Sequence, residues 1–203
     1  RWEAGQMRSK TLILAAIAGS PAPADVAAYA GALERVLKDA TVDQAFKALM
    51  LGLPGEAEIA AAIGRDVDPD AVAAARDGIR RDLGQALWPT LMDLWKATAA
   101  ITPYRPDPAG TARRSLRYAV LQLFMLADPQ RASGLAQSEI EAADSMTAEI
   151  GALSALIQDA GPTREGALDG FLARYGTDPL LVDKWLMLNA QCTSLSPEGT
   201  RRH

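Results

Sequence analysis

The stretch from residue 107 to 127 constrains the fold more than any other part of the chain. It reads DPAGTARRSLRYAVLQLFMLA. Its Asp-Pro start is typical of a helix N-terminus, because aspartate caps free N–H groups and proline needs no donor at the first helical position. One face is apolar at helical spacing, through Leu116, Ala119, Val120, Leu123 and Phe124. Three further residues make its second half apolar on every side: Leu121, Met125 and Leu126. Such a helix must be surrounded by other helices, so we expect it at the centre of an all-helical body.

The rest of the chain also reads as helix. Ala and Leu are abundant, aromatic residues make up only 5%, and β-branched residues are scattered, which favours helix over sheet. We expect helices at 2–18, 25–38, 41–52, 56–64, 69–100 with a kink or break at Trp88-Pro89, 129–142, 146–159, 163–175 and from 179 onward. Short loops at regular intervals predict antiparallel helix hairpins in a HEAT- or armadillo-like superhelical arrangement.

Several helix starts carry a specific capping signal. Thr41 lies three residues before Gln44, which is the spacing of a capping box. Asp144 is the expected cap of the helix that begins at Met146. We expect a single helical domain over residues 1–203, with a division into two lobes near 102–106 and a frayed polar tail at 193–203.

Composition argues against several classes of function. The net charge is −4, so we expect neither nucleic acid nor a membrane as a partner. The most apolar run, 12–18, is too short to cross a bilayer. Cys192 is the only cysteine, which excludes an internal disulfide and favours a reducing, cytoplasmic location. With no histidine near it in sequence, we expect Cys192 to be structural and not a reactive thiol.

The sequence predicts no catalytic, cofactor-binding or metal-binding residue in this chain. The only histidine is His203, so neither a His-Glu-x-x-His zinc site nor a Ser-His-Asp triad can form within it. Acidic residues cluster at Glu139, Glu141 and Asp144 and again at Glu56 and Glu58. Helix starts and solvated faces explain both clusters, although a di-carboxylate site without histidine stays open.

Arginines form two further clusters, at 113–117 and at 76–81. Arg113, Arg114 and Arg117 are expected to keep the first turns of the 107–127 helix in water. Guanidinium groups suit carboxylates, so they are candidates for holding an acidic partner or a peptide carboxylate. We favour a solvated face, paired with Asp107 or Asp128. The same interpretation applies to Arg76, Arg80 and Arg81.

Tryptophans occur at two positions where packing is the favoured role. Trp88 and Trp95 lie seven residues apart and therefore share a helix face. Trp185 follows Asp183 and Lys184, which form a local polar pair beside it. We expect all three rings to anchor the core and not to form a ligand cage.

Several short motifs together resemble one known family. They are RWEAGQ at 1–6, LPGEAE at 53–58 followed by VDPDA at 67–71, YRP at 104–106 with RRSLR at 113–117, ADSMT at 143–147 and VDKW at 182–185. In this order, they resemble the C-terminal helical region of bacterial aminopeptidase N, the alanyl aminopeptidase of the zinc gluzincin class. Ser145 departs from this pattern, because the family carries Asn before Met-Thr.

The resemblance implies a zinc enzyme that removes N-terminal residues from peptides. In that family the zinc motif, the catalytic glutamate and the Gly-Ala-Met-Glu-Asn segment lie upstream of this region, so zinc belongs to the catalytic domain of the parent enzyme. The implied role of this chain is a non-catalytic lid and wall of the peptide-access chamber. Its implied partners are the upstream catalytic domain and peptide substrates. The chain starts at Arg1 without methionine, and we expect it to be part of a longer polypeptide.

Two alternatives stay open from the sequence. The chain could be a free-standing α-helical repeat scaffold that binds a peptide or protein partner on a concave face. A weaker alternative is a regulatory domain that binds a small molecule. An upstream His-Glu-x-x-His motif in the same reading frame favours the aminopeptidase, whereas a stop codon there favours the scaffold.

Overall fold

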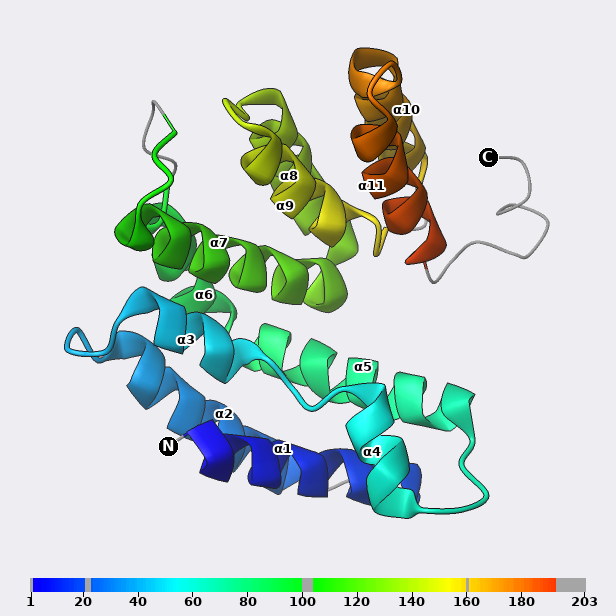
Figure 1. Cartoon of the computed structure of the whole chain (residues 1–203). Helices are drawn as coiled ribbons and strands as arrows, with labels where there is room; N and C mark the ends of the chain where they lie inside the picture. Colours follow the sequence, from blue (N-terminus) through cyan, green and yellow to red (C-terminus); the bar gives the residue numbers. More distant parts are fainter. Residues whose placement is uncertain (1, 21–22, 100–103, 160, 193–203) are drawn as a thin grey trace.

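The computed structural model describes residues 2–20, 23–99, 104–159 and 161–192 of the chain (Figure 1). All regular secondary structure in these ranges is helical, which confirms the predicted all-α class. The helices are α1 (Trp2–Ile17), α2 (Pro23–Lys38), α3 (Gln44–Leu51), α4 (Glu56–Ile63), α5 (Pro69–Ala86), α6 (Trp88–Ala97), α7 (Pro108–Ala127), α8 (Pro129–Glu141), α9 (Met146–Leu156), α10 (Pro162–Tyr175) and α11 (Pro179–Ala190).

Asp-Pro pairs begin four of these helices, as the sequence predicts. The side chains of Asp68, Asp107, Asp128 and Asp178 each accept a hydrogen bond from a backbone N–H in the first turn of the helix that follows. In each case proline occupies the start of that helix, where its missing N–H costs nothing.

Two predicted caps are wrong by one or two residues. Asp43 caps α3 by accepting the N–H of Phe46 at 2.9 Å. Thr41 instead donates its own N–H and hydroxyl to the carboxylate of Asp39. At α9 the cap is Ser145 and not Asp144, because the Ser145 hydroxyl accepts the N–H of Ala148 at 3.3 Å.

The long helix predicted over residues 69–100 is two helices. α5 ends at Ala86 and α6 begins at Trp88, with Leu87 between them at φ −93° and ψ 0°. Pro89 has no N–H and its ring crowds the preceding turn, so the helical hydrogen-bond pattern cannot continue through this point. Trp88-Pro89 therefore marks a full break and not a kink. α6 ends at Ala97.

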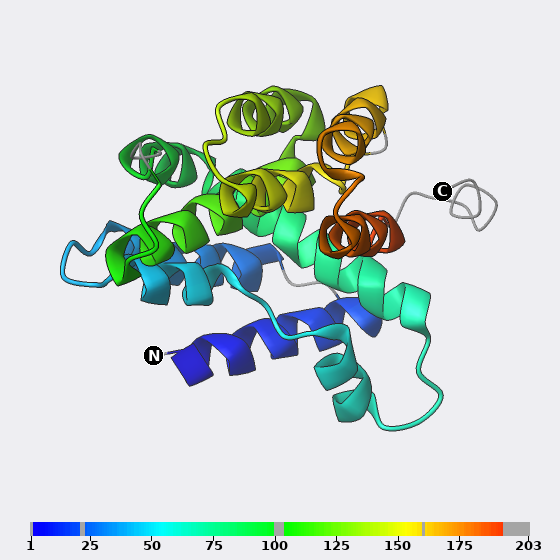
Figure 2. The same cartoon turned by 45° about the horizontal axis from the view of Figure 1, so that its top comes forward.

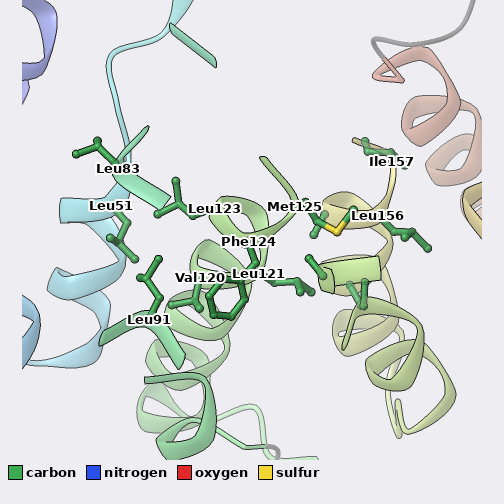
Figure 3. Packing of buried hydrophobic residues seen from close by; sticks show 14 of the residues in the cluster. Leu51, Leu83, Leu91, Val120, Leu121, Leu123, Phe124, Met125, Leu156 and Ile157 are labelled. Atoms are coloured by element: carbon green, nitrogen blue, oxygen red, sulfur yellow. The ribbon is translucent and has the colours of Figure 1, made fainter. Parts of the chain in front are cut away.

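α7 lies at the centre of the molecule, as predicted. It packs against α3, α5 and α6 and also against α8 and α9, and it runs between the two groups in Figure 1. Figure 3 shows its side chains reaching both sides, toward Leu83 and Leu91 and toward Leu156. Its most deeply buried residues are Leu116, Val120, Leu121, Phe124 and Met125.

Helix hairpins lie on both sides of α7 and of the helices that cover it. α1 and α2 pack together, and both contact α5, while α4 lies against α1 and α5. On the other side α8 packs on α9 and α10 on α11, and α10 also contacts α8 and α9 (Figures 1 and 2). This arrangement confirms the predicted HEAT- or armadillo-like hairpins.

The predicted lobe boundary near 102–106 stays a prediction. Residues 100–103 lie outside the described ranges, and so does the tail at 193–203. α7 contacts helices on both sides of the loop and therefore belongs to neither side alone. Across the described ranges, no helix combines the length and apolar character that crossing a membrane requires.

A glycine permits the closest approach between α5 and α7. A Cβ atom on Gly84 would lie 2.8 Å from both the Cβ of Ala127 and the carbonyl oxygen of Leu123. Backbone atoms cannot give way at this distance, so any larger side chain would push the two helices apart. Gly84 therefore fixes how tightly α5 covers the apolar end of α7.

Phe124→Ala tests the central position of α7. The ring is fully buried and packs on Trp88 at 4.4 Å and on Trp95 at 6.3 Å between ring centroids. Its removal should lower the free energy of unfolding by about 3–5 kcal/mol, because a large cavity remains. Urea unfolding measures this, with Met7→Ala (66% exposed) as a control expected to change stability by less than about 0.5 kcal/mol. A Phe124→Ala cost near that of the control would contradict the assignment.

Candidate functional site

A cavity of about 180 Å³ lies where two of the sequence motifs meet. Its walls come from the loop at 104–107, the first half of α7, the end of α8 and the start of α9. The backbone N–H of Tyr104 donates to the carboxylate of Asp144 at 2.7 Å, which ties the loop to the start of α9. This contact brings the 104–106 and 143–147 motifs together across 40 residues of sequence.

A second cavity of about 500 Å³ lies beside the first and shares Tyr104, Arg114 and Tyr118 with it. It adds Met146 and Ile150 of α9 and Lys184 of α11. Lys184 of the 182–185 motif therefore reaches the same region as the two motifs named above. Three of the sequence motifs line one continuous part of the molecule.

Arg117 corrects the prediction of a solvated arginine face. It is only 6% exposed. Its Nε donates to Glu139 Oε2 at 2.7 Å, and a second nitrogen pairs with Glu139 Oε1. Nη1 donates to the carbonyl of Trp95 at 2.6 Å, and the guanidinium lies 3.5 Å from the centroid of the Trp95 ring. Arg117 thus joins α6, α7 and α8, and its partner is neither Asp107 nor Asp128.

Arg113 and Arg114 are half-buried and hydrogen-bond only to neutral oxygens within the described residues. Arg114 donates to the carbonyl of Arg105 and to the hydroxyl of Thr111, both at 3.2 Å. Its guanidinium also lies 4.6 Å from the centroid of the Tyr104 ring. Arg113 makes one long bond of 3.4 Å to the carbonyl of Ala97. Both line the first cavity, and neither forms an ion pair with a carboxylate among the described residues.

The acidic cluster near residue 140 separates into distinct structural roles. Glu139 pairs with Arg117, whereas Glu141 accepts from Gln137 at 3.0 Å. Asp144 accepts from the backbone of Tyr104, which explains why the α9 cap passes to its neighbour. In the part of the chain that the structure describes, no three His, Cys, Asp or Glu side chains gather where they could hold a metal ion.

Tyr118 lines both cavities and is held in place by a glycine. A Cβ atom on Gly151 would lie 2.4 Å from Cε2 of the Tyr118 ring, so the ring rests directly on the backbone of α9. Burial, together with the nearby charge of Glu139, raises the pKa of Tyr118 to about 12. Tyr118 is therefore a neutral, rigid surface at physiological pH.

Three of the five remaining arginine and acidic candidates have structural partners, and the other two are exposed. Arg76 Nε donates to the carbonyl of Pro54 at 2.9 Å, which ties α5 to the 53–58 motif. Arg80 pairs with Asp77 at 3.4 Å, while Arg81 is exposed. Glu58 pairs with Lys10 at 2.8 Å, and Glu56 is exposed in the first turn of α4.

The predicted packing role of the tryptophans is confirmed. Trp88 and Trp95 both contact Phe124 in the core. Trp185 is buried and donates its Nε1 to the carbonyl of Leu168 at 3.0 Å, which joins α11 to α10. Asp183 and Lys184, which precede this ring in the sequence, are both exposed.

A buried carboxylate that the sequence analysis did not single out is Glu149. It pairs with Arg174 and accepts from the Tyr175 hydroxyl at 3.1 Å, so it fastens α9 to α10. Burial and this neighbouring charge raise the pKa of Tyr175. The available signal is its spacing, because Glu149 falls on the buried stripe of α9 with Leu153 and Leu156.

Breaking the Arg117–Glu139 pair should be costly. Glu139→Leu leaves the buried Arg117 without a carboxylate, so the free energy of unfolding should fall by about 3–5 kcal/mol. The matched control is Arg117→Met with Glu139→Leu, which strands no charge and should cost less than the single change. Urea denaturation of both variants measures the difference. A double variant at least as unstable as the single one would contradict this role.

Cys192 should be unreactive in the folded protein. It is 7% exposed, donates its thiol to the carbonyl of Leu188 at 3.4 Å, and has a pKa raised by burial. The thiolate is the reactive form, so dithionitrobenzoate at pH 8 should modify Cys192 slowly. In urea the same thiol should react at the rate of a free cysteine. Equal rates in the two conditions would show that the site is open.

Comparisons with known proteins place these motifs in a family. The sequence model of the family described as "Domain of unknown function (DUF3458_C) ARM repeats" matches residues 1–197. Aminopeptidase N of Caulobacter vibrioides is 37% identical over 193 residues, which is 94% of this chain and 22% of that protein. Aminopeptidase N of Escherichia coli K12 is 30% identical over 194 residues, again 94% of this chain and 22% of that protein.

A solved structure has the same fold. The crystal structure of Legionella pneumophila aminopeptidase A in complex with aspartic acid superimposes with a TM-score of 0.80 at 20% identity. The match covers 100% of this chain and 24% of that one. The chain spans about a fifth to a quarter of the length of the relatives it matches. It belongs to the DUF3458_C family of ARM-repeat domains and corresponds to the C-terminal helical region of bacterial aminopeptidase N.

Proposed function

We propose that this chain is a non-catalytic helical segment of a zinc-dependent aminopeptidase N, and that it forms the lid and wall of the peptide-access chamber. The observation that carries the proposal is the match to Aminopeptidase N of Caulobacter vibrioides, which runs over 94% of this chain but only 22% of that protein. The catalytic work then belongs to the remainder of such a polypeptide.

The structure supports a wall in two ways. α7 is packed on both sides, and polar joints at Arg117 and Glu149 fasten the helices around it. Close-packed helices of this kind deform little, so a face of this segment can keep its shape when a substrate binds there. The arginine side chains that line the first cavity also suit the C-terminal carboxylate of a peptide.

This proposal assigns zinc and the partners by family. Zinc would be held by the upstream catalytic domain, where the family carries its metal ligands, and not by residues of this chain. The partners would be that catalytic domain and the peptides it cleaves. A cytoplasmic location follows the same assignment and fits the use of a single buried cysteine.

Activity measurements on two polypeptides test the division of labour. The 203-residue chain alone should bind no stoichiometric zinc and should not hydrolyse alanyl-p-nitroanilide, whereas the longer polypeptide that contains it should do both. Zinc-dependent hydrolysis by the short chain, surviving purification with a chelator and restored by added zinc, would overturn the proposal.

The chamber role needs its own measurement. In the longer polypeptide, removal of this segment should raise or lower the kcat/KM for long peptides relative to that for alanyl-p-nitroanilide, because a wall acts on large substrates most. Zinc content and circular dichroism of the shortened protein verify that its catalytic domain stays folded. An unchanged ratio would contradict a role in peptide access.

The second candidate is a free-standing scaffold that binds a peptide or protein on a concave face. The ARM-repeat description and the helix hairpins favour it, because such repeats present extended binding surfaces. The reading frame separates the two candidates. An upstream His-Glu-x-x-His motif in frame with Arg1 supports the aminopeptidase, and a stop codon supports the scaffold.

A further inference from the structure

We propose that the cavity between the 104–107 loop, α7 and the start of α9 is a carboxylate-binding site, and that it takes the C-terminal carboxylate of a peptide. The carboxylate is inferred from the cavity itself, while its assignment to a peptide rests on the function proposed above. The charge of the cavity, its geometry and the space beside it each support this site.

The cavity has the opposite charge balance to the whole chain. The chain carries 25 acidic against 21 basic residues, whereas the cavity is lined by four arginines and three carboxylates. Each of the three carboxylates already has a role. Asp107 accepts the N–H of Gly110 at 2.6 Å, Asp144 accepts that of Tyr104, and Glu139 pairs with Arg117. The pairing of Glu139 with Arg117 leaves Arg105, Arg113 and Arg114 against Asp107 and Asp144, so an incoming anion meets a net positive charge.

Arg113 and Arg114 supply the geometry for a carboxylate. They are adjacent in the first turns of α7, and both line this cavity. A guanidinium binds a carboxylate through two parallel N–H···O bonds. Arg114 is held by the Tyr104 ring and by two neutral oxygens, so little side-chain freedom is lost when it binds.

The neighbouring cavity offers room for the last side chain of the ligand. Arg114 and Tyr118 line both cavities, so a carboxylate at Arg114 lies beside the second one. Tyr118, Met146 and Ile150 give that space an apolar surface, and Lys184 adds a positive charge to it. The site thus fits a peptide that ends in an apolar residue and disfavours one that ends in a basic residue.

A titration with matched peptides tests the site. The 203-residue chain, labelled with ¹⁵N, is titrated with acetyl-Ala-Ala-Leu as the free acid, with the same peptide as its C-terminal amide, and with acetate. The acid should bind at least about tenfold more tightly than the amide, because only the acid can form charge-assisted bonds. It should also bind more tightly than acetate. Equal affinities of acid and amide would overturn the site, and equal affinities of peptide acid and acetate would overturn the peptide as its ligand.

Substitutions identify the residues that carry the preference. Arg114→Gln should abolish the difference between acid and amide, and Arg114→Lys should retain only part of it, because lysine lacks the bidentate fork. Arg81→Gln is the matched control, since Arg81 is exposed on α5 and does not line the cavity. Should Arg114→Gln lose its helical circular dichroism, Arg113→Gln gives the decisive measurement, because Arg113 makes only one long bond. Full acid preference in a folded variant of either arginine would contradict the assignment.

The two proposals fail separately. The peptide titration reports on the cavity in this chain alone, whereas the long-peptide ratio reports on the chamber in the longer polypeptide. A changed ratio without any acid preference would remove the carboxylate site and leave the chamber role intact. Acid preference with an unchanged ratio would do the reverse.

Discussion

The burial of α7 on two opposite sides of its second half is the constraint on which the structure depends. Leu123 and Met125 lie on opposite sides of the helix, and both are excluded from water. No single neighbour can cover them, so α3 and α5 pack on one side while α8 and α9 pack on the other. Because α5 carries Gly84 at the crossing, its backbone can approach closely enough to close that side.

The first half of α7 is organised by charge instead. Arg117 is buried, but it bonds Glu139 of α8 and the carbonyl that ends α6, so its desolvation is offset by hydrogen bonds. This joint leaves its neighbours Arg113 and Arg114 at the mouth of the cavity with only neutral partners in the described residues. The same helix therefore serves as the core at one end and as the wall of a charged cavity at the other.

Local signals in the sequence were sufficient for much of this fold. The Asp-Pro starts, the central place of α7 and the break at Trp88-Pro89 each follow from residues close together in the chain. The failures involve distant partners. Arg117 appeared solvated because Glu139 lies 22 residues away on another helix, and Asp144 lost its cap role because the distant backbone of Tyr104 occupies it.

The cavity could not be predicted, because its walls meet only in three dimensions, although the family motifs supplied many of its residues. Ser145 caps α9, a position that Asn would also suit, since both residue types cap helices.

The shared position of α7 also bears on how this protein loses its structure. In a linear repeat array each unit touches only its neighbours, so the ends can unravel while the middle persists. Here α3 and α9, which are far apart in the chain, pack against the same helix, α7. Detaching either one exposes apolar surface of α7 to water, and the helices on the opposite side cannot cover that surface. Unfolding of the helices on one side of α7 should therefore be coupled to unfolding of those on the other side, as in a small globular protein and unlike a solenoid.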